Sequence, residues 1–234
     1  MRRLLVLLGA AVAALGGTLP ADAATRECQG LQVCVPVAGP WVAVPTTRSL
    51  PRPTVRFQLS CPPGHVVGGT DAELTDRGID VSFAAKLGSP VNPGISTERG
   101  ALFSATYVGA TARIATFRPH VGCIPAAGGG RIPTALSALF RPGEPTVRRV
   151  TTVRVQAGEL RTIGRRCGAR ERLVDGWHAL AFRGGTPPVA AIVRALTAGR
   201  RLGSNRVTVS ARGGFALAST RALVQVGAVC ARMR

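Results

Sequence analysis

Apolar and polar residues alternate along several short stretches of the chain, which is the pattern of strands with one buried face. The alternation is clearest at 54–60, where Val55, Phe57 and Leu59 fall on one side and polar residues on the other. Gly- and Pro-rich stretches separate these segments and favour turns. Residues 188–196 fit either a strand or a two-turn helix. The sequence therefore predicts an all-β fold, with strands near 54–60, 79–83, 101–107, 111–117, 147–156, 177–182, 206–210, 215–218 and 222–229.

The two halves of the chain follow the same plan. In each half a strand leads into a cysteine, a turn and further strands follow, and a last strand ends in a second cysteine. We therefore expect a signal segment at 1–23, a β module at 24–128, a Gly/Pro-rich linker at 129–146 and a second module at 147–234, related by internal duplication. Each module is expected to be a β-sandwich or jelly-roll-like unit clasped by one disulfide. The alternative is one larger β-sandwich to which both halves contribute.

Six cysteines in one exported chain indicate three disulfides, for which 15 pairings exist. Spacing narrows the choice, because two pairs are separated by nearly equal intervals and the remaining pair is close in sequence. The expected bonds are Cys28–Cys34, which closes a short knuckle, Cys61–Cys123 and Cys167–Cys230. A zinc site would need closely paired Cys or His ligands, and the sequence lacks that spacing, so no metal site is expected.

The N-terminus has the three parts of a secretory signal peptide. Arg2 and Arg3 precede an apolar run at 4–15, and small residues end the segment at Ala21-Asp22-Ala23. The alternative, a membrane anchor, would need roughly 18–20 apolar residues, and this run is shorter. We expect cleavage after Ala23 and no membrane-spanning segment in the mature chain. The mature protein would then be secreted, or associated with the cell envelope.

The charge is large and uneven. The formal net charge is +19. Residues 24–130 carry nine basic and six acidic side chains, whereas residues 131–234 carry nineteen basic and four acidic ones. Such asymmetry favours an anionic partner for the basic half, for example an anionic envelope polymer, although charge spread evenly over a solvated surface is the simpler interpretation. The candidate anion-binding residues are Arg148, Arg149, Arg165, Arg166, Arg170, Arg172, Arg200 and Arg201.

A turn and the strand after it resemble a known kind of protein. Cys61-Pro62-Pro63-Gly64 precedes Val66-Val67-Gly68-Gly69, and a later strand closes at Cys123. This arrangement resembles uncharacterised exported bacterial β modules built on Cys-Pro-x-Gly…Cys. The second half matches more loosely, because Gly168-Ala169-Arg170 departs from the turn motif. The resemblance implies export and a disulfide-stapled β fold, and it implies no activity.

Motifs for catalysis are missing from the sequence. It contains no G-x-S-x-G elbow, no H-E-x-x-H and no P-loop, and all cysteines are assigned to disulfides. No catalytic residue and no cofactor are therefore expected. The nearest approach to a catalytic set is His178 with Asp175, which would need a serine to complete a triad. His65 and His120 are expected to have structural or surface roles.

Two further residue groups have simple structural interpretations. The acidic residues Asp71, Glu73, Asp76 and Asp80 lack the order of a calcium loop, and a solvated acidic loop is the preferred interpretation. The aromatic residues Trp41, Tyr107 and Trp177 are too few for a stacking platform and are expected in the core. The leading hypothesis is a non-catalytic structural or ligand-binding protein. The alternatives are a polyanion-binding protein that uses the Arg-rich second half and, with less support, an exported hydrolase.

Overall fold

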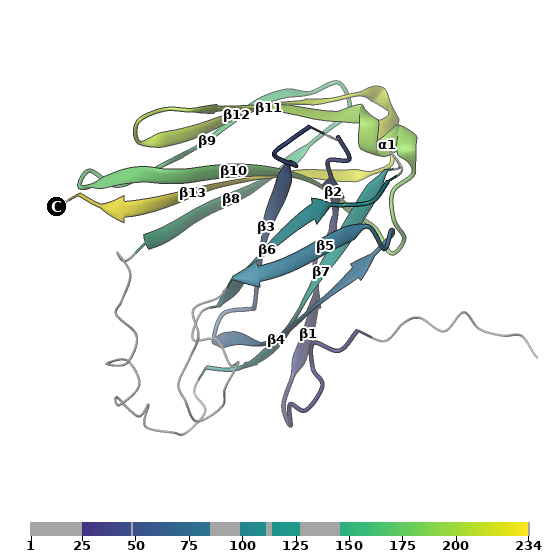
Figure 1. The fold of residues 1–234 in the computed structure, drawn as a ribbon, viewed down its shortest axis with the longest axis vertical. Coiled ribbons are helices and arrows are strands. Elements are labelled where there is room, and N and C mark those ends of the chain that lie inside the picture. The colour runs from purple at the N-terminus through teal and green to yellow at the C-terminus, as the bar shows by residue number, and fades with distance from the viewer. Residues whose placement is uncertain (1–24, 48, 85–98, 111–113, 127–145, 234) are drawn as a thin grey trace, which may run out of the picture.

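The computed structural model describes residues 25–47, 49–84, 99–110, 114–126 and 146–233, and its regular structure is almost entirely β, as the sequence predicts (Figure 1). The strands of the first half are β1 (Val35–Ala38), β2 (Trp41–Val44), β3 (Thr54–Ser60), β4 (His65–Leu74), β5 (Ile79–Ala84), β6 (Gly100–Tyr107) and β7 (Ala115–Pro125). Those of the second half are β8 (Thr146–Val155), β9 (Leu160–Arg166), β10 (Glu171–Arg183), β11 (Leu196–Leu202), β12 (Arg206–Gly213) and β13 (Arg221–Arg232). A helix α1 (Ala190–Ala195) and a 3-10 turn η2 (Phe215–Leu217) complete the described elements.

The alternation of apolar and polar residues in the sequence corresponds to an alternation of buried and exposed side chains in the strands. In β3, Val55 and Phe57 are buried, whereas the polar residues at alternate positions, Thr54, Arg56, Gln58 and Ser60, are at least partly exposed. The structure differs from the prediction at 215–218, where η2 replaces the expected strand and Phe215 is exposed. It also resolves the ambiguity at 188–196 as the short helix α1.

Seven strands form one sheet that runs through both halves of the chain. Its order is β1-β7-β2-β10-β13-β8, and β4 pairs with the other edge of β7. β1 and β2 lie end to end along β7, because they pair with its residues 120–123 and 115–117. The first half meets the second where β2 pairs with β10, through Val42 with Ala181 and Trp41 with Phe182. The two halves therefore share one sheet.

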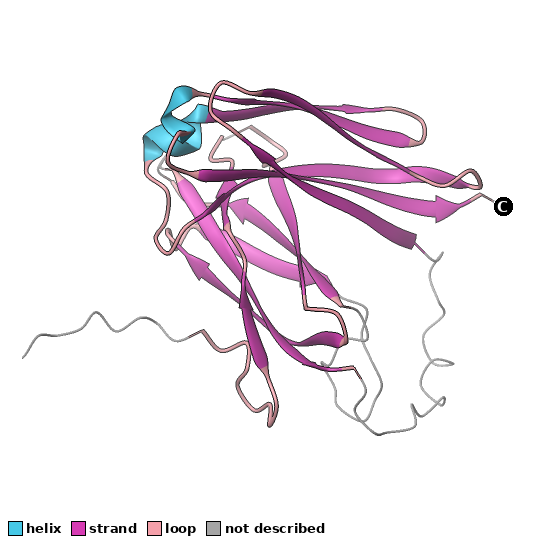
Figure 2. Cartoon of the chain, turned by 180° about the vertical axis from the view of Figure 1, so that it is seen from behind, coloured by secondary structure: helices cyan, strands magenta, loops and turns pink. Residues whose placement is uncertain are grey.

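Two three-stranded sheets, β3-β6-β5 and β11-β12-β9, pack on opposite faces of this shared sheet (Figures 1 and 2). Successive side chains of β10 show that the two small sheets cover different faces. Ala179 and Ala181 belong to the core that contains Phe57, whereas Phe182 belongs to the core that contains Val209. Because neighbouring residues of a strand point to opposite faces, the two cores lie on opposite sides of β10. In Figure 1, β9, β11 and β12 form the outer layer at the top of the molecule.

The predicted disulfide pairing is confirmed in full. Cys28–Cys34 closes the N-terminal knuckle, Cys61–Cys123 joins the end of β3 to β7, and Cys167–Cys230 joins the end of β9 to β13. Each long bond therefore ties a three-stranded sheet to the shared sheet within its own half. On the chain-entropy model, each of these two bonds stabilises the fold by about 4 kcal/mol.

Strand pairing around the two long disulfides is the same in both halves. The amide of Cys61 donates to the carbonyl of Arg99, and that of Cys167 donates to the carbonyl of Asn205, just before β6 and β12 respectively. Val67 lies six residues after Cys61 and Leu173 six residues after Cys167, and they pair directly with Cys123 and Cys230 respectively. A register shift follows at once in both strands, at Gly68 and Val174.

The module prediction is only partly matched. The all-β class, the antiparallel sheets and the disulfides are as predicted. Separate sandwiches for the two halves are not confirmed, because β2 and β10 join both halves into one sheet. The expected signal segment, and the expected linker apart from Thr146, lie outside the described residues, so the domain boundaries stay predictions.

Candidate anion-binding face

The outer face of the β11-β12-β9 sheet collects four arginines. In this sheet Arg206 pairs directly with Arg166, Thr208 with Arg201, and Arg212 with Thr197. Directly paired residues of antiparallel strands project from the same face. On β12 the intervening residues Val207, Val209 and Ala211 are buried, so the face that carries the arginines points to solvent. We call this surface the basic face; its members are Arg166, Arg201, Arg206, Arg212, Thr162, Thr208, Ser210, Gly164 and Gly199.

Small residues form the floor between these arginines. Thr162 pairs with Ser210, and Ser210 also pairs with Gly199, so two hydroxyls and a glycine span the three strands. An open hollow of about 630 Å³ lies over this floor, and an adjoining one of about 400 Å³ extends toward Gly164 and Arg166. The basic face is thus a shallow depression with a basic rim.

No acidic residue balances these charges within the sheet. The strands β9, β11 and β12 contain three, two and two arginines, seven in all, and no Asp or Glu. Arg166, Arg201, Arg206 and Arg212 are exposed, and none of their side chains makes a hydrogen bond or ion pair with another described residue. Their field is therefore directed at solvent, where it attracts anions.

The other three arginines of this sheet have structural roles. Arg165 and Arg161 donate to the carbonyls of Val150 and Arg154 on β8, each at 2.9 Å, and Arg200 donates to the carbonyl of Gly176 on β10. These donors satisfy backbone acceptors of the neighbouring sheet, so they are not available to a ligand without loss of those bonds.

The eight candidate arginines from the sequence therefore separate by position. Only Arg166 and Arg201 lie on the basic face. Arg149 forms an ion pair with Glu171, and Arg148 donates to the carbonyl of Ala84. Arg170 lies in the turn before β10 and Arg172 on β10 itself, away from the basic face.

Arg206 and Arg212 belong to the basic face and were missed as candidates. The signal was present in the alternating segment at 206–210, whose polar positions Arg206, Thr208 and Ser210 share one face.

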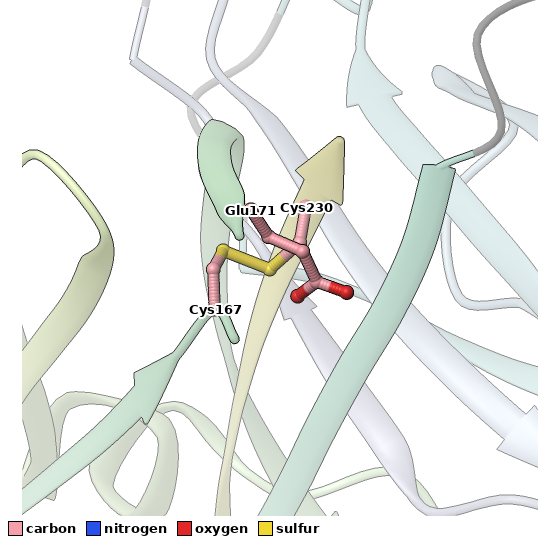
Figure 3. A group of neighbouring side chains, drawn as sticks. All are labelled: Cys167, Glu171 and Cys230. Atoms are coloured by element: carbon pink, nitrogen blue, oxygen red, sulfur yellow. A yellow bond between two sulfur atoms is a disulfide. The ribbon is translucent and has the colours of Figure 1, made fainter. Parts of the chain in front are cut away.

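Three potential metal ligands lie together in the second half, but two of them are joined in a disulfide. Cys167, Glu171 and Cys230 lie together, and Figure 3 shows the sulfurs bonded to each other and the carboxylate beside them. Oxidised sulfurs are not thiolate ligands. The Glu171 carboxylate accepts from the amide of Gly168 and from Arg149, and these bonds, the first above all, lower the pKa of Glu171 below its usual value. Glu171 thus fixes the turn between β9 and β10.

The residues considered for hydrolysis are not brought together. No register shift separates Asp175 from His178 on β10, so their side chains project from opposite faces. Asp175 pairs with Arg56, and Nδ1 of His178 is buried without a partner among the described residues. Burial, and secondarily Arg200, lowers the pKa of His178. The structure therefore gives no geometric support to a triad built on this pair.

The acidic residues of the first half serve separate partners. Asp71 accepts from the amide of Arg26, Glu73 lies 2.8 Å from Nε2 of the buried His120, and Asp76 accepts from the amide of Gly78. Asp80 is exposed on β5. The prediction of one solvated acidic loop is therefore not matched: Asp71 and Glu73 lie on β4, and only Asp80 of the four is fully exposed.

The three aromatic residues are core residues, as predicted. Trp41, Tyr107 and Trp177 are each buried, and Trp177 lies against Gly227 of β13. The arginine of β7, Arg118, stacks over the Trp41 ring at 5.8 Å. These rings are not displayed for stacking on a ligand.

A larger hollow, of about 770 Å³, lies between β3-β6-β5 and β8. Its rim includes Ala84, Arg99 and Thr146, which border residues outside the described part of the chain, and no site is assigned there. Within the described ranges, every helix is too short or too polar to cross a bilayer. No family model, curated protein or solved structure was found to match the chain.

Proposed function

We propose that the protein is an exported, non-catalytic β protein that binds an anionic polymer through the basic face. The observation that carries this proposal is the set of four exposed arginines on one face of one sheet, without acidic neighbours in that sheet. Guanidinium groups suit this task, because each donates two parallel hydrogen bonds to a carboxylate, sulfate or phosphate.

Export is supported by two features. Three disulfides are typical of proteins that mature in an oxidising compartment. The first 23 residues have the composition of a cleaved signal peptide. An extracellular or envelope location would also bring the basic face into contact with anionic polymers.

We also propose that the two halves arose by internal duplication, the second derived from the same unit as the first. The support is the equal register around the two long disulfides and the equal order of the two small sheets, β3-β6-β5 and β9-β12-β11. The shared register shift at Gly68 and Val174 is the most specific of these features, because such shifts are local and seldom coincide.

The test of binding compares two triple variants of equal charge. In Arg166→Gln/Arg201→Gln/Arg206→Gln the basic face loses three charges, and in Arg52→Gln/Arg183→Gln/Arg221→Gln three exposed arginines elsewhere are replaced. The probe is polyacrylate, a linear polycarboxylate, titrated by calorimetry across a salt series. At about 0.5–1 kcal/mol for each exposed ion pair, the first variant should lose affinity by about ten-fold or more.

The control variant should lose affinity by less than about three-fold, because its charges act only through the screened field. Binding by the wild type should weaken as salt rises, and the variant on the basic face should show a shallower dependence. Equal losses in the two variants would mean that net charge alone causes binding, and the proposal would fail.

A further inference from the structure

Along β12, the basic face has positively charged ends and a middle region that carries hydroxyl groups. Arg206 and Arg166 are directly paired at one end, with Arg201 one row further along, and Arg212 lies at the other end. Six residues of strand place Arg206 about 20 Å from Arg212. The rows between them carry the hydroxyls of Thr208, Ser210 and Thr162.

The hydroxyls of this middle region are available to a ligand. Those of Thr162, Thr208 and Ser210 make no hydrogen bond to any other residue that the structure describes. A Cβ added at Gly199 would meet no atom within 4 Å, so the floor beside Ser210 is open. A ligand that lay on this floor would meet groups that both donate and accept hydrogen bonds.

An anion without hydroxyl groups would use only the arginines. A single-stranded nucleic acid would normally stack its bases on aromatic side chains. The strands β9, β11 and β12 contain no Phe, Tyr or Trp. The combination of charged ends with a hydroxyl floor instead matches a chain that carries both acidic groups and many hydroxyls.

β3, the strand of the first half that corresponds to β9, contacts the second half. On β3, Arg56 pairs with Asp175, and both the amide and the carbonyl of Gln58 bond to the side chain of Gln225. Thr162 and Gly164 hold the corresponding places on β9, because they lie five and three residues before Cys167, as Arg56 and Gln58 lie five and three residues before Cys61. Both are exposed. No described residue packs over them.

We infer that the polymer bound by the basic face is an acidic polysaccharide that lies along β12. Its acidic groups contact Arg166, Arg201 and Arg206, and its sugar hydroxyls exchange hydrogen bonds with Thr162, Thr208 and Ser210. This inference rests on the proposed function and adds the class of ligand to it.

The experiment removes hydroxyls without changing charge. The variant Thr162→Val/Thr208→Val/Ser210→Ala is compared with Thr47→Val/Thr186→Val/Ser219→Ala, which removes three exposed hydroxyls elsewhere. Valine suits an exposed strand position, and circular dichroism with urea unfolding verifies the fold of each variant. The probes are polygalacturonate, a carboxylated polysaccharide, and polyacrylate, which has carboxylates and no hydroxyls.

Loss of the floor hydroxyls should lower affinity for polygalacturonate by about ten-fold and change affinity for polyacrylate by less than about two-fold. The control should leave both affinities unchanged. Equal effects on the two polymers, or no effect on polygalacturonate, would overturn the inference and leave the proposed function standing. If Arg166→Gln/Arg201→Gln/Arg206→Gln bound both polymers as well as the wild type, the proposed function itself would fail.

Discussion

Gln225 offers a direct test of how the two halves are held together. This residue of β13 is 2% exposed, and its side chain reaches the open edge of β3. Its Oε1 accepts from the amide of Gln58 at 2.6 Å, and its Nε2 donates to the carbonyl of Gln58 at 2.9 Å. Nε2 also lies 3.1 Å from the hydroxyl oxygen of Thr152. The side chain of Gln225 thus makes the two hydrogen bonds to β3 that the backbone of a neighbouring strand would otherwise make.

The variant Gln225→Leu keeps the approximate volume and removes these bonds. Two backbone groups of β3 would lose their partners, at about 1–3 kcal/mol each, and part of that loss would be offset by water that reaches the half-buried Gln58. We therefore expect the free energy of unfolding to fall by about 2–4 kcal/mol. The measurement is urea unfolding at equilibrium with the disulfides intact.

The matched control is Gln58→Ala. The hydrogen bonds between Gln225 and Gln58 use only the backbone of Gln58, and Oε1 of Gln58 is buried without a partner in the part of the chain that the structure describes. Truncation of Gln58 should therefore change stability by less than about 1 kcal/mol. If Gln225→Leu were as mild as this control, Gln225 would not hold the small sheet to β13, and the reasoning would be refuted.

Two further predictions concern packing and pH. A Cβ at Gly122 would lie 2.1 Å from the carbonyl oxygen of Glu27, so Gly122→Ala should displace the N-terminal knuckle and lower stability by about 1–3 kcal/mol, with faster proteolysis near Arg26; an unchanged cleavage rate would contradict this. Burial lowers the folded-state pKa of His178, so the unfolded chain binds the proton first as pH falls. The stability contributed by neutral His178 is present above the unfolded pKa, near 6.5, and declines below it toward the folded pKa. Urea unfolding at pH 7.5 and pH 5 should therefore show a smaller loss of stability in His178→Gln than in the wild type, and equal losses would refute the assignment.

The sequence predicts the local structure well because the signals are local. Alternation within 54–60 specifies which side chains of β3 are buried, and a strand has only two faces to choose between. The disulfides also follow from the sequence, since two nearly equal intervals leave Cys28 and Cys34 as neighbours.

The joining of the halves could not be predicted in this way. β2 meets β10 through only two directly paired positions, and the bonds between strands are made by backbone groups that every residue carries. The sequence of β2 is equally compatible with an edge strand, and its neighbouring prolines favour that interpretation. Whether β2 is an edge strand or joins the two halves depends on how segments distant in the sequence pack together.

The candidate arginines were only partly identifiable for a geometric reason. Adjacent residues of a strand point to opposite faces, so the two side chains of each Arg-Arg pair on a strand lie on different faces of the sheet. Arg165 and Arg200 turn toward backbone carbonyls, whereas Arg166 and Arg201 turn toward solvent. A pair of basic residues on a strand therefore adds one charge to a face, and a basic face is better sought at alternate positions.

The proposed duplication explains why corresponding positions carry different residues. Gly69 lies eight residues after Cys61 and Asp175 eight residues after Cys167, each immediately after the register shift. In the first half the carbonyl of Glu27 would lie 2.1 Å from a Cβ at Gly69, so the N-terminal knuckle requires glycine there. The second half has no such knuckle among the described residues, and Asp175 pairs instead with Arg56 of the first half. The basic face shows a similar difference between the halves: Arg56 and the backbone of Gln58 contact the second half, whereas Thr162 and Gly164, at the corresponding positions of β9, are exposed.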